Sequence, residues 1–237
     1  MFHLIRLKSY PIYEQLLLEE KLLRSNEGNW CVINEGSTPA IVMGISGKKE
    51  EWVDCSKAAQ DQIPLIKRFS GGGTVVVDEN TLFLTFICQK QLHDFPAYPE
   101  PIMKWMEQIY ATALQLPGLR LRENDFVIDD RKFGGNAQYI KKDRWLHHTS
   151  LLWDYTPEKM AYLLHPKKTP PYRAGRSHAE FLCRLSDYFP DKKALIGRIV
   201  NELGNRFLVK PVSLEEALLM CTESSRQSTT LIEYDGL

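Results

Sequence analysis

The sequence predicts an α+β protein, and three observations support this. Apolar residues recur at helical spacing over residues 12–24, 101–116 and 191–206. Short runs rich in apolar, β-branched and aromatic residues, such as 30–34 and 40–45, lie between turn residues and are typical of strands. A chain of 237 residues, 43% of them hydrophobic, is long enough to bury a sizeable core.

Each element in the first half of the chain has its own local signal. The helix over 12–24 follows Pro11, and charged residues separate its leucines. Residues 74–87 predict two apolar strands joined as a hairpin at Asp78-Glu79-Asn80. The helix over 101–116 is closed by Pro117-Gly118.

The second half continues with strands and then changes composition. Residues 119–129, 133–142 and 144–154 predict a β-meander, and Thr156-Pro157 predicts a short helix over 157–164. Residues 1–165 are therefore expected to form the core of one domain. Residues 166–237 are expected to add a basic, proline-containing loop (Pro166 to Arg176) and a helical C-terminal segment that packs on the same domain. The helices of this segment are expected over 191–206 and 214–222. A Ser213/Glu216 capping box opens the second of them.

Composition narrows the class of protein. Lys+Arg and Asp+Glu are 30 each, so no overall charge favours a nucleic acid or an anionic membrane as partner. No apolar run approaches the length of a membrane span, and we expect a cytoplasmic protein. The five cysteines never form a CxxC pair, so neither a disulfide framework nor a zinc knuckle is expected.

The most informative stretch is Ser70-Gly71-Gly72-Gly73, which follows Lys67-Arg68-Phe69 and precedes Thr74-Val75-Val76-Val77. Glycines between β-forming residues indicate that the backbone approaches something closely. Freed N–H groups suit an anion or a carboxamide, and Arg68 adds a planar donor fork for carboxylate or phosphate. A glycine-rich β-turn is the plain alternative.

A second stretch carries a lysine beside glycines. Asn124-Asp125 precedes Lys132-Phe133-Gly134-Gly135-Asn136-Ala137, and His147-His148 follows. Lys132 is either a solvated hairpin lysine or a cation aimed inward beside exposed backbone. The two histidines are neighbours on an expected strand, so at most one of them faces a site.

Taken together, over residues 2–155, these motifs resemble the lipoate–protein ligase A family, part of the superfamily that includes biotin–protein ligases and octanoyl transferases. The resemblance implies mixed and antiparallel β-sheets packed with helices, as in that catalytic domain. It implies that Lys132 is catalytic, and that the acyl chain and nucleotide are bound by Arg68, Ser70, Gly71, Gly72, Gly73, Asn124, Asp125, Gly135, Ala137 and His148. Two departures concern the substrate pocket: Val77-Asp78 stands where the family has His-Asp, and His148-Thr149-Ser150 where it has His-Gly-Thr.

The resemblance implies ATP-dependent attachment of lipoate, or a related medium-chain acyl group, to a lysine of an acceptor protein through an acyl-adenylate. ATP, Mg²⁺ and lipoate are the expected small molecules, a lipoyl-domain protein the expected acceptor, and a separate accessory subunit a further expected partner. Asp125 is either the base for the acceptor amine or a magnesium ligand. Two alternatives stay open: a transferase that forms a thioester on a cysteine such as Cys183, and a non-catalytic lipoyl-adenylate-binding subunit.

Two further expectations concern the shape of the site. The strands Val75–Val77 and Leu82–Phe86, with Trp153 or Phe133, are candidates to line a slot for an aliphatic tail. The loop from Pro166 to Arg176 either folds over the site, with Arg173 or Arg176 reaching the phosphate, or is a solvated linker.

Overall fold

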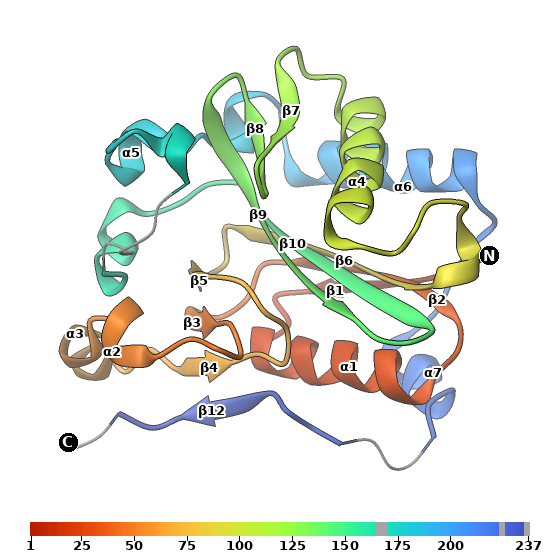
Figure 1. The fold of residues 1–237 in the computed structure, drawn as a ribbon, viewed down its shortest axis with the longest axis horizontal. Coiled ribbons are helices and arrows are strands. Elements are labelled where there is room, and N and C mark those ends of the chain that lie inside the picture. Colours follow the sequence, from red (N-terminus) through yellow and green to blue (C-terminus); the bar gives the residue numbers. More distant parts are fainter. Residues whose placement is uncertain (165–169, 223–225, 235–237) are drawn as a thin grey trace.

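In the computed structural model, which describes residues 1–164, 170–222 and 226–234, two β-sheets meet, and helices cover the larger one (Figure 1). The larger sheet has the order β11-β1-β2-β6-β10-β9-β8-β7 and the smaller one β12-β4-β3-β5. Pairings are parallel for β1 with β2 and β11 and for β3 with β4, and antiparallel elsewhere. The strands are β1 (Phe2–Lys8), β2 (Asn29–Glu35), β3 (Ala40–Met43), β4 (Leu65–Lys67), β5 (Thr74–Val77), β6 (Thr81–Gln89), β7 (Leu119–Arg122), β8 (Asp125–Ile128), β9 (Arg131–Ile140), β10 (Arg144–Leu152), β11 (Val209–Pro211) and β12 (Thr230–Ile232).

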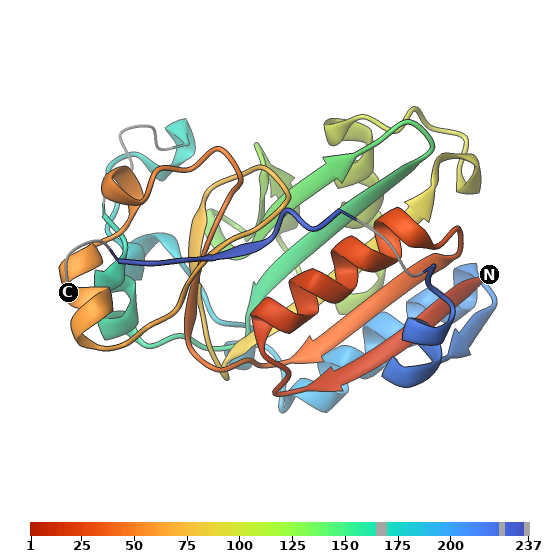
Figure 2. The ribbon, with the colours of Figure 1, turned by 90° about the horizontal axis from the view of Figure 1, so that it is seen from below.

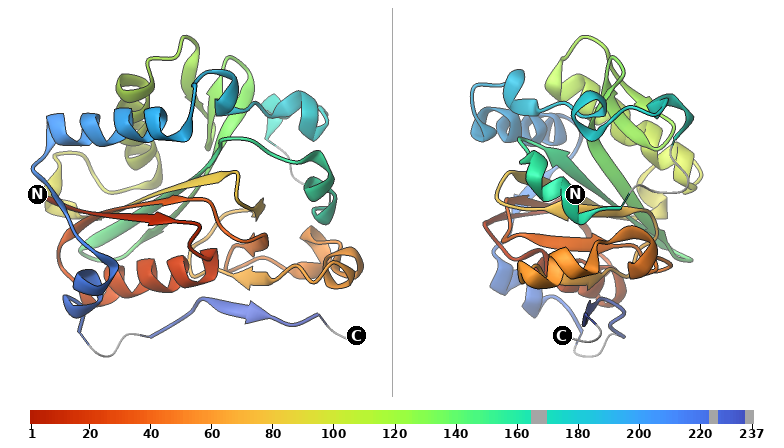
Figure 3. Two further views of the ribbon diagram at one scale, coloured as in Figure 1. Left: turned by 180° about the vertical axis from the view of Figure 1, so that it is seen from behind. Right: turned by 90° about the vertical axis from the view of Figure 1, so that its left-hand side faces the viewer.

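Helices lie on both faces of the larger sheet. The helices α4 (Pro99–Leu114) and α6 (Lys192–Arg206) cover one face, and α1 (Ile12–Ser25) covers the other (Figure 3). Apolar side chains of each helix join a separate core cluster, with Trp105 and Tyr110 on the first face and Leu16 and Leu22 on the second. Burial on both faces explains why strand β6 is a continuous apolar run rather than an alternating one.

The other helical elements of the described residues are short. None of the helices in the described residues is long and apolar enough to cross a membrane. The remaining helices and 3₁₀ turns are α2 (Lys49–Trp52), α3 (Cys55–Gln60), η1 (Lys90–Leu92), η2 (Pro157–Tyr162), η3 (Pro171–Arg173), α5 (His178–Phe181), η4 (Leu185–Asp187) and α7 (Leu214–Leu219).

The α+β prediction is confirmed, but the expected hairpin at 74–87 is wrong. The turn at Asp78 exists, with the Thr81 N–H donating to the Asp78 carbonyl at 3.1 Å. Strand β5 then pairs with β3 in the smaller sheet, while β6 pairs with β2 and β10 in the larger one. Two strands that are apolar on both faces each find partners far away in the sequence, so the turn joins two sheets instead of closing a hairpin.

The β-meander is confirmed, with one extra strand. The run 119–129 divides into β7 and β8, because Glu123 adopts a left-handed φ of 53° and turns the chain between them. Residues 157–162 form a 3₁₀ turn instead of the expected α-helix. The Ser213/Glu216 capping box at α7 is present as predicted.

Strand β12 returns to pair with β4, so residues 230–232 form an edge of the smaller sheet (Figure 2). The fully buried carboxylate of Glu20 binds the two residues that directly precede this strand. Glu20 accepts hydrogen bonds from the backbone N–H groups of Ser228 and Thr229, from the Thr229 hydroxyl at 3.0 Å, and from Arg24. The first helix therefore anchors the last strand through one side chain.

Glu20→Ala is expected to lower the free energy of unfolding by about 2–3 kcal/mol, because buried N–H groups would lose their acceptor. Urea unfolding would measure the loss, and limited proteolysis would show earlier cleavage near residue 228. Glu14→Ala, on the exposed face of the same helix, is the matched control and should change little. Equal stability of both variants would contradict the anchoring role.

Candidate functional site

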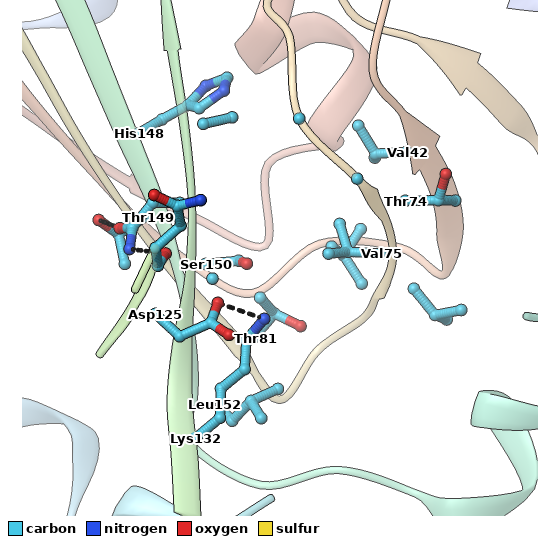
Figure 4. A pocket seen from close by; sticks show the side chains of 18 of the residues that line it. Val42, Thr74, Val75, Thr81, Asp125, Lys132, His148, Thr149, Ser150 and Leu152 are labelled. Atoms are coloured by element: carbon cyan, nitrogen blue, oxygen red, sulfur yellow. Dashed lines mark hydrogen bonds and ion pairs between the residues drawn. The ribbon is translucent and has the colours of Figure 1, made fainter. Parts of the chain in front are cut away.

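A cavity of about 780 Å³ lies between the two sheets, and one of its walls is apolar. That wall includes Leu16 of α1, Val42 of β3, Val75 of β5 and Phe83 of β6. In Figure 4, Val42 and Val75 lie across the cavity from strand β10. Lys132 and Asp125 point toward one another at the end of the cavity away from His148. The cavity thus combines an apolar wall with an ion pair.

A β-bulge aims Lys132 into this cavity. The pairing of β8 with β9 matches Val127 to Lys132 and Phe126 to Gly134, so Phe133 is the extra residue. The irregularity buries both Phe133 and Gly134, while Lys132 and Gly135 both line the cavity. A Cβ on Gly135 would lie 3.4 Å from the Lys132 ammonium, so the missing side chain leaves room for the cation.

The positive charge of Lys132 is balanced by the neighbouring Asp125 carboxylate. Its Nζ lies 2.7 Å from the Asp125 Oδ1, and both side chains are mostly buried. The second carboxylate oxygen accepts the Tyr172 hydroxyl at 2.7 Å. Burial, followed by the charge of Asp125, raises the pKa of Tyr172, which therefore stays a hydrogen-bond donor at neutral pH. Residues from two strands and from the segment after residue 170 thus meet at one point.

The glycine loop holds itself in place through Arg68. This buried side chain donates to the Ser70 hydroxyl at 3.0 Å, the Val42 carbonyl at 3.3 Å and the Gly71 carbonyl at 2.7 Å. Burial lowers the pKa of Arg68 to about 10. The sequence suggested a donor fork for a ligand, whereas the structure directs all three nitrogens of this guanidinium to the loop and the neighbouring strand.

Only one of the three loop glycines has a left-handed φ. Gly72 has a φ of 101°, and a Cβ there would lie 2.8 Å from the Arg68 Nη2. Added Cβ atoms on Gly71 and Gly73 would meet no atom within 4 Å. Gly72 is thus required by the fold of the loop, while Gly71 and Gly73 leave open space beside the cavity.

A hydrogen-bonded chain links the loop to helix α1. The Ser70 Oγ lies 2.9 Å from the His148 Nε2, and the His148 Nδ1 lies 3.0 Å from the fully buried Glu19 carboxylate. Glu19 also accepts from Gln15 and Thr85, both at 2.7 Å. A carboxylate oxygen only accepts, so the geometry favours the ring tautomer in which the His148 Nδ1 donates to Glu19.

The neighbouring His147 is buried on the opposite face, so the prediction that at most one of the two histidines faces the site is confirmed. Burial lowers the pKa of His147 to about 3, so it is neutral. It lies within hydrogen-bonding distance of Gln138, Asn136 and Thr149.

The structure brings most of the predicted site residues together. Ser70 is fully buried behind the loop and reaches the site through His148. Trp153 and Phe133 belong to the core cluster beside α4 and α6, so their expected place in the acyl slot is wrong. The predicted residues that line the cavity are Arg68, Gly71, Gly72, Gly73, Asn124, Asp125, Lys132, Gly135, Ala137 and His148.

Sequence reasoning missed Gln15 and Glu19. They lie four residues apart on the buried face of α1, next to Ile12 and Leu16. A polar pair at helical spacing within an apolar stripe was the available signal, because such a pair is buried only with hydrogen-bond partners.

Asp125 and Glu19 are already engaged by protein groups and do not fit a magnesium ion. Magnesium is held by carboxylates together with substrate phosphates. Both Asp125 oxygens already bind Lys132 and Tyr172, and Glu19 accepts from Gln15 and Thr85 and lies 3.0 Å from the His148 Nδ1. Among residues 1–164, 170–222 and 226–234, no group of three or more His, Cys, Asp or Glu is arranged to hold a metal.

The part of the expected loop that the structure describes is packed against the site. Residues 165–169 of this stretch lie outside the described residues. Tyr172 and Arg173 are buried, and Tyr172 also donates its N–H to Glu123 at 3.4 Å. From Pro170 onward the solvated-linker interpretation is therefore wrong.

Comparison with known proteins agrees with this architecture. Residues 11–207 match the model of the lipoyl protein ligase A/B catalytic domain, and the chain belongs to this family. An archaeal bi-partite lipoate protein ligase, described with its lipoyl domain from Thermoplasma acidophilum, has a TM-score of 0.73 at 18% identity and covers 92% of this chain and 89% of that one. A lipoate-protein ligase A bound with ATP has a TM-score of 0.71 at 16% identity, covering 92% and 91%. At these identities the two structures show the shared fold.

Two curated relatives are 29% identical to this chain. The inactive lipoate–protein ligase 2 of Plasmodium falciparum (isolate 3D7) aligns over 243 positions, 77% of this chain and 62% of the relative. The lipoate-protein ligase LplJ of Bacillus subtilis (strain 168) aligns over 158, which is 65% of this chain and 46% of the relative. The chain thus spans only about half to three-fifths of the length of these relatives.

The glycine loop offers a matched pair of variants. Gly72→Ala is expected to lower the free energy of unfolding by about 1–3 kcal/mol, since it forces a side chain into a left-handed backbone and against Arg68. Gly73→Ala should stay within about 0.5 kcal/mol of the parent. Denaturant unfolding of both variants is the measurement, and equal losses would refute the assignment of strain to Gly72.

Proposed function

We propose that this protein attaches lipoate to a lysine of an acceptor protein, using ATP and passing through a lipoyl-adenylate. The observation that carries the proposal is the Lys132–Asp125 ion pair inside a cavity with an apolar wall. An apolar wall suits an aliphatic tail, and a fixed cation suits the carboxylate and phosphate that must react at its head. Membership of the lipoyl protein ligase A/B catalytic domain family supports the same reaction.

In the first step, a carboxylate oxygen of lipoate attacks the α-phosphorus of ATP, and pyrophosphate leaves. Lys132 has three N–H donors and uses one on Asp125, which leaves two for the acyl carbonyl and a phosphate oxygen. Its positive charge offsets the negative charge that the two anions bring together. The open sides of Gly71 and Gly73 allow backbone N–H groups to approach the same ligand.

In the second step, the acceptor amine attacks the acyl carbon, the bond to the phosphate oxygen breaks, and AMP leaves as the amine loses its proton. Lys132 stabilises the tetrahedral oxyanion by charge and hydrogen bonding. Asp125 serves mainly to fix Lys132, because both of its oxygens are engaged by Lys132 and Tyr172. We assign the accepting lysine to a lipoyl-domain protein, such as the domain described with the archaeal ligase.

A cysteine-based transferase is a weaker candidate. Cys183 is buried, its thiol donates to the Arg131 carbonyl, and burial raises its pKa to about 11. A nucleophilic cysteine requires an accessible thiolate, and this environment opposes one.

A non-catalytic role is the second candidate, and two facts favour it. One relative is named an inactive ligase, and this chain spans only part of the length of such relatives. In that case the cavity would bind lipoyl-adenylate, and transfer would depend on a further subunit. Pyrophosphate release by the purified chain distinguishes the two roles.

Lys132→Ala is expected to reduce lipoate-dependent pyrophosphate release by about a hundred- to a thousandfold, because a preorganised charge is lost at the reacting atoms. Thermal unfolding would check that the fold persists. Lys142→Ala, at the exposed turn after the same strand, is the matched control and should keep full activity. A Lys132 variant that retains a third of the parent rate would exclude the proposed role.

Cys183→Ser is expected to leave lipoate transfer nearly unchanged, and transfer should require ATP. Mass spectrometry of the protein during turnover would test for a thioester. An adduct on Cys183, or ATP-independent transfer from an acylated carrier protein, would favour the transferase instead.

A further inference from the structure

One buried cation at the site has an unused donor. Arg173 is 6% exposed and lines the cavity, and its Nη2 has no hydrogen-bond partner among the described residues. A buried, unpaired guanidinium N–H is costly unless a ligand supplies an acceptor. This nitrogen is therefore evidence of a binding position.

The surrounding segment holds Arg173 in place. Tyr172 ties the segment to Asp125 by its hydroxyl, and the Arg173 Nε donates to the Arg176 carbonyl at 3.0 Å. The guanidinium lies 5.1 Å from the centre of the Phe181 ring. Because the other oxygen of Asp125 binds Lys132, the segment is anchored at the Lys132 end of the cavity.

The other cations nearby are already engaged. Lys132 pairs with Asp125, and Arg68 donates from all three nitrogens to its own loop and to Val42. Arg176 donates to the backbone carbonyls of Arg173 and Tyr172, so it braces the segment. Arg173 differs in that one of its guanidinium nitrogens is buried and has no hydrogen-bond partner among the described residues.

We propose that Arg173 binds the nucleotide phosphate, with Arg176 as a positioning residue that shapes the segment. This inference rests on the proposed function and extends it to a second phosphate contact beside Lys132. Phosphate fits better than the lipoate carboxylate, because the carboxylate loses its charge on activation while the phosphate stays anionic in the adenylate. Planar guanidinium donors also match phosphate oxygens.

The experiment compares AMP with adenosine, which differ in the phosphate alone. Calorimetric titration of the full chain would give the ratio of the two dissociation constants for the parent, R173Q, R173K and R176Q. In R173Q the preference for AMP should fall by about tenfold or more, the size of one charge-assisted hydrogen bond. R173K should keep part of the preference. R176Q should lower the same preference by a smaller factor, because Arg176 only positions Arg173.

The ratio separates the possible failures. A retained AMP preference in R173Q would overturn the phosphate assignment, even if the binding of both ligands fell. Equal binding of the two ligands by the parent would overturn it as well. If the parent binds neither AMP nor ATP, the ATP-dependent function itself fails, which is a different result from an unchanged ratio.

Discussion

A positive charge is stable in a largely apolar cavity only where an acceptor lies beside it, and Lys132 depends on Asp125 for this. The pair exists because strand β9 bulges at Phe133, which places Lys132 and Gly135 at the cavity and Phe133 in the core. Without the bulge, strict alternation would put Lys132 and Gly134 on one face and Gly135 on the other. One extra residue in a strand thus sets the position of the cation.

In the glycine loop, too, a buried positive charge, that of Arg68, is stabilised by nearby acceptors. Arg68 is buried without a carboxylate in direct contact, and its charge is met by neutral oxygens and, through Ser70 and His148, by Glu19. Hydrogen bonds that run from Arg68 to Ser70 and from Ser70 to His148 polarise one another in a low-dielectric interior. This series of hydrogen bonds makes the conformation of the glycine loop depend on helix α1, even though the loop and the helix are far apart in the sequence.

Local patterns predicted local structure well. The helix at 12–24 and the meander at 119–154 were readable because their periodicity or turn residues lie within the segment itself. The hairpin at 74–87 was wrong because the partners of β5 and β6 lie elsewhere in the chain. Lys132 and Asp125 were suggested by resemblance, but their pairing depends on a bulge and on Tyr172. Glu19 was missed because its partners come from β6 and β10.

The segment from Pro170 to Cys183 supports the Lys132 position of strand β9 at two points. Near one end, Tyr172 binds the carboxylate that holds Lys132. At the other end, the Cys183 N–H donates to the Lys132 carbonyl at 2.9 Å. The lysine is therefore braced at its side chain and at its backbone by the same segment. The side chain of Cys183 packs into the core cluster beside α4 and α6, so this bracing residue presents no exposed thiolate to the cavity.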